Sequence, residues 1–345
     1  MSALPRVRRL AVPQPVLDQL EAHGIGISRI LDLVEDRLRK QVASSHRFVD
    51  EAAKYLMDAG GKRFRPMVVS LAAHLGDATR DEIPDAGVVV ELVHLATLYH
   101  DDVIDEAPAR RGTPSANTRW DNTIAILTGD YLFARASELS ADLGVEVTRI
   151  MAQTIASLCE GQIREVQGSV GALPPDVPAL EPTLDHYLTV VAEKTASLIA
   201  TSARLGALLA GCAPEDVAAA TEYGWNMGMA FQLSDDLLDI ASEHEDSGKT
   251  PGTDLREGVR TLPVLYAIED DPGGELDALL SADELSGDAV ARALELLRGS
   301  RAMERARQTA ADYVAGSIDA LEPFEGQSIT KALRRLSEYA LDRVG

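Results

Sequence analysis

The sequence predicts an all-α fold in one domain, and three observations carry that prediction. Apolar residues recur at helical spacing along almost the whole chain, whereas the two-residue alternation of half-buried strands is nearly absent. Of the 345 residues, 46% are hydrophobic and only 4% aromatic, so the core must be built from Ala, Leu, Val and Ile. No loop between the helical stretches resembles a domain linker. We therefore expect residues 1–345 to form a single domain.

The helical pattern is interrupted at clear breaks. Prolines stop it at 108–114, and the segment 168–182 contains four prolines. The segment 246–258 is rich in Gly and charge, and 270–274 ends another helix. Between these breaks, helices are predicted at about 14–40, 45–59, 64–76, 83–106, 118–140, 145–168, 183–210, 214–244, 261–269, 288–298, 301–320 and 328–344.

The charge balance narrows the function classes. A net charge of −22, from 33 basic and 55 acidic side chains, argues against nucleic-acid binding and a basic membrane-docking face. A phosphorylated substrate remains compatible if metals and local cations invert the sign inside one pocket. Two cysteines are too few for a disulfide framework, and no apolar run reaches the roughly 18 to 20 residues of a membrane span. The N-terminus lacks the apolar core of a signal peptide, so we expect a cytoplasmic protein.

Two acidic pentads are the most informative feature. Residues Asp101–Asp105 (the first pentad) and Asp235–Asp239 (the second pentad) both carry aspartates at positions 1, 2 and 5. At about 100° per residue these carboxylates crowd one helix face. One such pentad alone is equally consistent with a solvated face. Both, however, end apolar helical stretches, where the helix dipole disfavours negative charge. The pair therefore predicts a magnesium site that holds a metal-bound diphosphate.

The flanks of the pentads carry a family resemblance. Arg110-Arg111-Gly112 follows the first pentad, and Phe231-Gln232-Leu233-Ser234 precedes the second. From about residue 45 to 270 the chain resembles the trans-polyprenyl diphosphate synthases of medium- or long-chain type. The resemblance implies an isoprenoid-synthase-type bundle of mostly antiparallel helices around a deep central cavity, usually in a homodimer. It also implies Mg²⁺-dependent head-to-tail condensation of isopentenyl diphosphate with an allylic diphosphate, with three ions per active site.

The resemblance also assigns roles to single residues. It makes Asp101, Asp102, Asp105, Asp235 and Asp239 the metal ligands, with Asp236, Lys194 and Thr195 as further catalytic residues. Isopentenyl diphosphate would bind Lys62, Arg65, His94 and Arg111, and the allylic diphosphate would bind Arg110, Lys194 and Lys249. Further substrate-binding residues would be Thr195 near the migrating charge, Gln232 at the family glutamine beside the second motif, and Arg260 where the family usually has Lys or Arg.

Other interpretations of these residues remain open. Lys62 and Arg65 lie three apart and can converge on one anion, but they also suit a helix N-terminus with surface cations. His94 could be a core histidine, Lys194 a snorkelling lysine, and Arg110 with Arg111 mere counter-charges for the pentad. Arg63 is left unassigned. Asp254 could order metals through water or cap a helix from Leu255 onward.

In the family, residues just before the first pentad form the floor of the cavity and limit chain growth. Here these are Val93, Ala96 and Thr97, all modest in size. We therefore expect a product longer than fifteen carbons, geranylgeranyl or longer, of the quinone side-chain type. Tyr99 lies about 200° from Asp101 around the helix and should point away from this channel.

Rival functions make different demands on the same residues. A class I terpene cyclase needs no second diphosphate pocket, which would leave Lys62, Arg65 and Arg111 unexplained; a head-to-head synthase has the same weakness. A non-catalytic subunit of a heteromeric prenyl synthase often loses pentad acids, and this chain keeps all six.

Overall fold

The computed structural model describes residues 26–169, 173, 176–242, 251–281 and 285–343. They form two compact units. The first comprises the described residues up to Ile155 together with Thr201–Thr221 and Pro323–Leu333. The second comprises Ala156–Ala200, Glu222–Glu322 and the described residues from Arg334 onward. That the whole chain acts as one domain stays a prediction.

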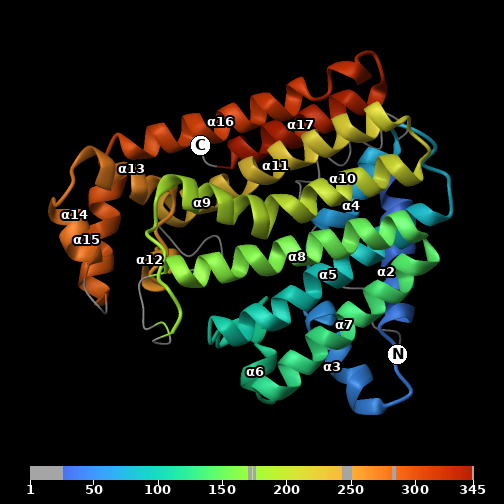
Figure 1. The fold of residues 1–345 in the computed structure, drawn as a ribbon, viewed down its shortest axis with the longest axis horizontal. Coiled ribbons are helices and arrows are strands. Elements are labelled where there is room, and N and C mark those ends of the chain that lie inside the picture. Colours follow the sequence, from blue (N-terminus) through green and yellow to red (C-terminus); the bar gives the residue numbers. More distant parts are fainter. Residues whose placement is uncertain (1–25, 170–172, 174–175, 243–250, 282–284, 344–345) are drawn as a thin grey trace, which may run out of the picture. The chain divides into compact units, whose positions relative to one another are not determined.

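The first unit is built around one long buried helix. Helix α5 (Glu82–Ile104) packs against α2, α4 and α7, and most of its side chains are buried (Figure 1). Its sequence is apolar on every face, as expected of a helix with neighbours all round. The other elements of this region are α2 (Ile27–Gln41), α3 (Arg47–Asp58), α4 (Phe64–Ala73), β1 (Ala109–Arg110), β2 (Thr113–Pro114), α6 (Ala116–Arg119) and α7 (Asn122–Asp142).

The second unit has its own core. Leu233 and Leu237 of α11 (Pro214–Ala241) are buried with Val264 of α13 (Leu262–Asp270) and Leu294 of α15 (Gly287–Arg298). The other elements are α9 (Leu184–Val191), the π-helical turn η1 (Ala192–Ala196), α12 (Thr253–Arg256), α14 (Glu275–Leu280) and α16 (Ala302–Asp319). The 3₁₀ turn η3 (Glu322–Phe324) contributes residues to both units. Helices α8 (Val145–Gly168), α10 (Ser197–Leu209), α11 and α17 (Ser328–Asp342) contribute residues to both units.

The all-α prediction is confirmed. Each predicted helix has its counterpart within a few residues, except that the predicted start of the first, at 14, lies outside the described residues. The pattern missed only elements too short to show a period. These are the two-stranded ribbon, α6, α12, α14, η3 and the π turn inside the predicted helix 183–210.

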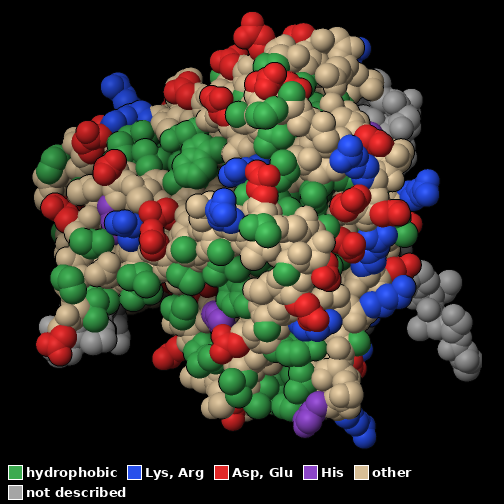
Figure 2. All heavy atoms as spheres, turned by 45° about the vertical axis from the view of Figure 1, so that its right-hand side comes forward, with side chains coloured by type: hydrophobic (Ala, Val, Ile, Leu, Met, Phe, Trp, Pro, Cys, Tyr) green, Lys and Arg blue, Asp and Glu red, His purple; other side chains and the backbone are tan. Residues whose placement is uncertain are grey.

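The surface mixes both signs of charge with apolar side chains. On the face drawn in Figure 2, acidic and basic groups are interspersed with hydrophobic ones. Cys159 and Cys212 are free thiols. Among the described helices, none combines the length and apolar character that a membrane crossing requires.

Candidate functional site

The first pentad ends α5, with Asp105 at the C-cap. Asp102 is fully buried, and Arg110 Nε donates to its Oδ1 atom at 2.6 Å. Its other oxygen, Oδ2, is also buried and has no hydrogen-bond partner within the described residues. Burial raises the pKa of Asp102, while the charge of Arg110 opposes that shift. Asp102 therefore has one oxygen held by an arginine and one buried oxygen whose hydrogen-bonding capacity is unused.

A tight hairpin positions the two arginines that follow this pentad. Strands β1 and β2 pair Arg110 with Thr113, leaving Arg111 and Gly112 as the two-residue loop. Both loop residues have positive φ, 53° and 74°, as a type I′ turn requires. Arg111 Nη1 donates to the backbone oxygens of Leu56, at 2.8 Å, and Gly60. The turn therefore ties Arg111 to the end of α3.

The glycine pair before Lys62 allows two guanidinium groups to approach the backbone. A Cβ atom on Gly61 would lie 2.5 Å from Arg63 Nη1 and 3.0 Å from Arg111 Nη1. Its φ of 157° also suits glycine. Any side chain at this position would push the two cations apart.

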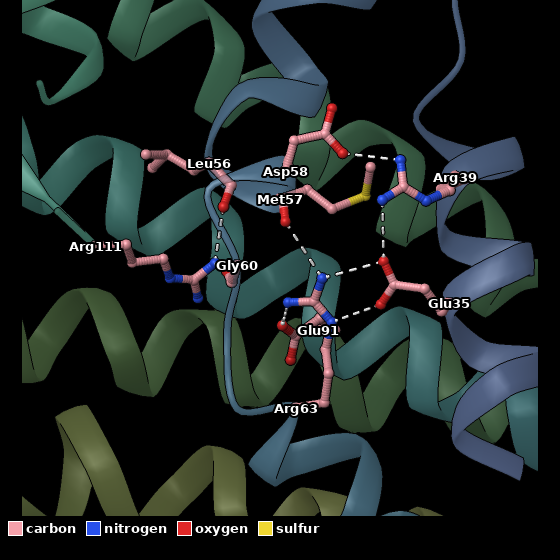
Figure 3. A network of polar contacts seen from close by, with 9 residues as sticks. All are labelled: Glu35, Arg39, Leu56, Met57, Asp58, Gly60, Arg63, Glu91 and Arg111. Carbon is pink, nitrogen blue, oxygen red and sulfur yellow. Dashed lines mark hydrogen bonds and ion pairs between the residues drawn. The ribbon is translucent and has the colours of Figure 1, made fainter. Parts of the chain in front are cut away.

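Arg63, unassigned from sequence, is a structural anchor. It is buried, and it lies between two carboxylates, Glu35 on α2 and Glu91 on α5, each at 2.9 Å (Figure 3). Glu91 is itself almost completely buried. A buried ion pair holds only when both partners stay, so this arrangement fixes the loop before α4 against α5.

His94 lies one turn beyond Glu91 and is surrounded by positive charge. Its pKa falls well below the usual range, first because of burial and then because of Arg65, Arg111, Arg63 and Arg110. The imidazole is therefore neutral at physiological pH. Arg63 already pairs with Glu35 and Glu91, and Arg110 with Asp102. The positive charge of Arg65 and Arg111 beside the neutral histidine nevertheless suits an anion.

The two remaining basic residues of this loop differ in exposure. Arg65 is half-buried, and burial lowers its pKa to about 10, with Glu91 and Asp101 opposing and Arg111 adding to that shift. Its Nε atom is buried without a hydrogen-bond partner in the described part of the chain. Lys62 is exposed to solvent.

The predicted chain-length residues lie on the same helix. Val93 and Ala96 are fully buried, and Thr97 is half-buried with its hydroxyl donating to the backbone oxygen of His94. Tyr99 packs toward α3, where its hydroxyl donates to Ala52 O and accepts from Leu56 N.

The second pentad lies in the last turns of α11. Both oxygens of buried Asp236 accept from neutral donors, the hydroxyl of Tyr187 and Gln232 Nε2. Burial raises the pKa of Asp236 to about 7, against the effect of these hydrogen bonds, and the neighbouring charges of Asp235 and Asp239 add to the rise.

The outer acids of this pentad have different partners. Asp235 Oδ1 accepts from Arg343, which follows α17. Asp239 accepts from the backbone N–H groups of Thr253 and Asp254 at 3.2 and 3.3 Å, so its carboxylate lies at the N-terminus of α12. Helix α12 begins after Gly252, so the alternative role of Asp254 as the cap of a helix from Leu255 is wrong.

Lys194 and Thr195 lie in the π-helical turn η1. Lys194 forms an ion pair with Glu165 of α8. Gly161 of the same helix allows the backbone of η1 to approach α8 closely, since a Cβ on Gly161 would lie 2.8 Å from the backbone nitrogen of Lys194. The Thr195 hydroxyl donates to Gln232 Oε1 at 3.0 Å. Since Gln232 also holds Asp236, this turn is linked directly to the second pentad. Such π turns are frequent at functional sites.

The last two predicted substrate-binding residues contribute less to this picture. Arg260 lies 3.7 Å from Asp277 and donates to Leu280 O at 3.5 Å, both in α14. Lys249 lies outside the described residues.

The donor set fits a hard divalent cation. All six pentad side chains offer carboxylate oxygens, and Asp102 Oδ2 is a buried acceptor without a donor. Within the described ranges, no three His, Cys, Asp or Glu side chains are already gathered around one point. Arg110 and Arg343 instead neutralise one carboxylate in each pentad.

Four residues of this site escaped sequence reasoning: Glu91, Glu165, Tyr187 and Arg343. Glu91 left a signal, because it is the lone acid within the apolar run 88–100. The other three contact the site from helices distant in sequence, and nothing in their local pattern marks them.

Comparison with known proteins agrees with these observations. The family model for polyprenyl synthetase matches residues 46–297. The chain is 44% identical over 325 residues to a nonaprenyl diphosphate synthase of Mycobacterium tuberculosis, covering 93% of both chains. It resembles the crystal structure of a decaprenyl diphosphate synthase from Rhodobacter capsulatus, with a TM-score of 0.86, 31% identity and coverage of 96% and 100%.

A second solved structure is the geranylgeranyl pyrophosphate synthase from Corynebacterium glutamicum complexed with calcium and isoprenyl diphosphate. Its TM-score is 0.80, with 38% identity and coverage of 97% of this chain and 99% of that one. Matches of this extent and identity, together with the pentads and their arginines, establish the relationship. The chain belongs to the polyprenyl synthetase family.

Proposed function

We propose that the protein is a Mg²⁺-dependent prenyltransferase that condenses isopentenyl diphosphate head-to-tail with an allylic diphosphate. Its product is an all-trans polyprenyl diphosphate. The observation that carries this proposal is the basic group beside the first pentad: Arg65, whose buried Nε has no hydrogen-bond partner in the described chain, with Arg111 and neutral His94. This cluster gives an acidic protein a binding place for a second diphosphate, which a terpene cyclase does not need.

The chemistry assigns each group a task. Bound Mg²⁺ supplies positive charge that stabilises the leaving diphosphate as the allylic C–O bond ionises. Asp101, Asp102, Asp105, Asp235 and Asp239 would hold three such ions, and Asp236 would keep the second pentad in place. Because both pentads act on one diphosphate, loss of either should stop the reaction.

The basic residues bind and orient the two substrates. Arg110, Lys194, Thr195, Gln232, Lys249 and Arg260 hold the allylic diphosphate. Lys62, Arg65, His94 and Arg111 hold isopentenyl diphosphate, with Arg forks suited to paired diphosphate oxygens. The C=C bond of isopentenyl diphosphate attacks the allylic cation, and the released diphosphate takes the proton that is then lost. Apolar side chains such as Val93 exclude the water that would quench the cation.

The product is longer than fifteen carbons, at least geranylgeranyl and of the quinone side-chain type. Small side chains at Ala96 and Thr97 and the names of the long-chain relatives support this length. We further propose a cytoplasmic homodimer.

Product sizing tests the proposal. The full chain is incubated with Mg²⁺, labelled isopentenyl diphosphate and geranyl, farnesyl or geranylgeranyl diphosphate, and the products are sized by chromatography. We expect allylic products longer than fifteen carbons and no turnover with chelator. Turnover of the allylic substrate alone would indicate a cyclase. An inert protein that activates a partner chain would indicate a non-catalytic subunit, and a sole fifteen-carbon product would refute the predicted length.

A further inference from the structure

Arg343 makes a contact that the proposed reaction does not use. Its Nη2 atom donates to Asp235 Oδ1, and its guanidinium carbon lies 5.0 Å from the ring centre of Phe231. Phe231 and Asp235 are one turn apart on α11, so both hold Arg343 on the same helix face. Stacking and ion pairing together make this a built contact across 108 positions of sequence.

The contact leaves the guanidinium incompletely satisfied. Arg343 is half-buried, and its Nη1 atom is buried with no hydrogen-bond partner among the described residues. A buried donor without a partner carries a desolvation cost. The arginine therefore neutralises Asp235 through one terminal nitrogen while the other terminal nitrogen stays unsatisfied.

We propose that Arg343 is the resident counter-cation of Asp235 and competes electrostatically with a divalent cation for the second pentad. This inference rests on the proposed function, because it takes Asp235 as a metal ligand. The guanidinium withdraws electron density from Asp235 Oδ1, and its positive charge repels a cation that approaches either oxygen of this carboxylate. Arg343 thereby sets how tightly the second pentad takes its cation.

Mn²⁺ binding to the full-length, substrate-free protein tests the competition, with electron paramagnetic resonance to count free Mn²⁺. Arg343→Ala should bind Mn²⁺ about three- to tenfold more tightly than the unmodified chain, since the competing charge is gone. The gain should vanish in the Asp235→Asn background, which removes the contested ligand. If the unmodified chain binds no measurable Mn²⁺, Arg343→Ala must reveal a site that the double variant lacks.

Arg305→Ala is the matched control. Like Arg343, Arg305 lies over an aromatic ring, with its guanidinium carbon 4.0 Å from the ring centre of Tyr266. It pairs with two acids, Glu269 and Asp270, where Arg343 pairs with one. The Arg305→Ala substitution removes the same charge from the same unit. Equal gains in Mn²⁺ affinity in both variants would therefore mean a general electrostatic effect and would overturn the proposal. So would unchanged or weaker Mn²⁺ binding by Arg343→Ala. If that result came with normal Mg²⁺-dependent product formation, the inference would fail while the proposed function stood.

Discussion

The two pentads have the same spacing but are neutralised by different means. In the first, Asp102 is held on one side by Arg110, and its second oxygen has no donor in the described chain. In the second, Asp236 has both oxygens bound by neutral donors, Tyr187 and Gln232. The same acid of the motif therefore keeps one buried oxygen without a donor in one pentad and has both oxygens bound by protein donors in the other.

The difference follows from the surroundings of each helix end. The first pentad lies among arginines brought by a tight turn and a glycine-containing loop, so charge compensates charge. In the second, neutral groups of α9 and α11 hold Asp236, and among the described residues Arg343 pairs with Asp235. A motif in sequence thus fixes the ligands offered, while the fold decides which of them are already engaged.

The largest expected effect is loss of turnover. Asp102→Asn and Asp235→Asn each remove a proposed metal ligand, so kcat should fall by about 10² to 10³ or more. Circular dichroism should show the helices unchanged. Near-normal kcat in both variants would contradict the shared metal role.

Loss of the buried ion pair between Arg63 and Glu91, in the arginine-rich site of the first pentad, should have a large effect on stability. Arg63→Ala leaves buried Glu91 without its partner and should cost about 3 to 5 kcal/mol of unfolding free energy. Arg39→Ala removes an exposed pair with Asp58 and a longer contact of 3.5 Å with Glu35. It should cost less than about 1 kcal/mol, because Arg63 still holds Glu35. Urea unfolding of both variants measures the difference, and equal losses would show that the buried pair carries no special weight.

The second pentad should make the unfolding free energy depend on pH. Burial raises the pKa of Asp236 to about 7 from an ordinary value of 3.8. Between these two pH values the unfolded chain has lost the Asp236 proton, whereas the folded chain retains it. Stability therefore declines as pH rises from about 4 to about 7.

Asp236→Asn lacks this titration. In metal-free buffer its unfolding free energy should therefore gain on that of the unmodified chain by up to roughly 1.4 kcal/mol per pH unit within this window. Above about pH 7 the difference should stay constant. A difference independent of pH between 4 and 7 would mean that Asp236 is already ionised there.

The smallest expected effect concerns the floor beside the first pentad. Ala96→Phe should shorten the product with little loss of stability if Ala96 lines a channel. Ala86→Phe, on the same helix and equally buried, should instead cost about 1 to 3 kcal/mol by overpacking. Unchanged product length with a similar stability loss for Ala96→Phe would place Ala96 in the packed core.

Sequence reasoning reached the helices and the motif residues but not their partners. Helical periodicity located α5 and α11 because each spans many turns. The pentads could be recognised because each is a short contiguous motif. The π turn at Lys194 and the ribbon at Arg110 are too short to leave a period. Tertiary packing brings Tyr187, Glu165 and Arg343 to the predicted site residues, so no local sequence pattern could predict these contacts.

The central claim is that acids of both pentads bind one magnesium diphosphate. A crystal structure of the full chain with Mg²⁺ and a non-reactive allylic diphosphate analogue tests it most directly. The account predicts oxygens of Asp101, Asp105 and Asp235 at about 2.0 to 2.1 Å from ions that share one diphosphate. An analogue bound elsewhere, with the pentad carboxylates turned to solvent and free of metal, would contradict it.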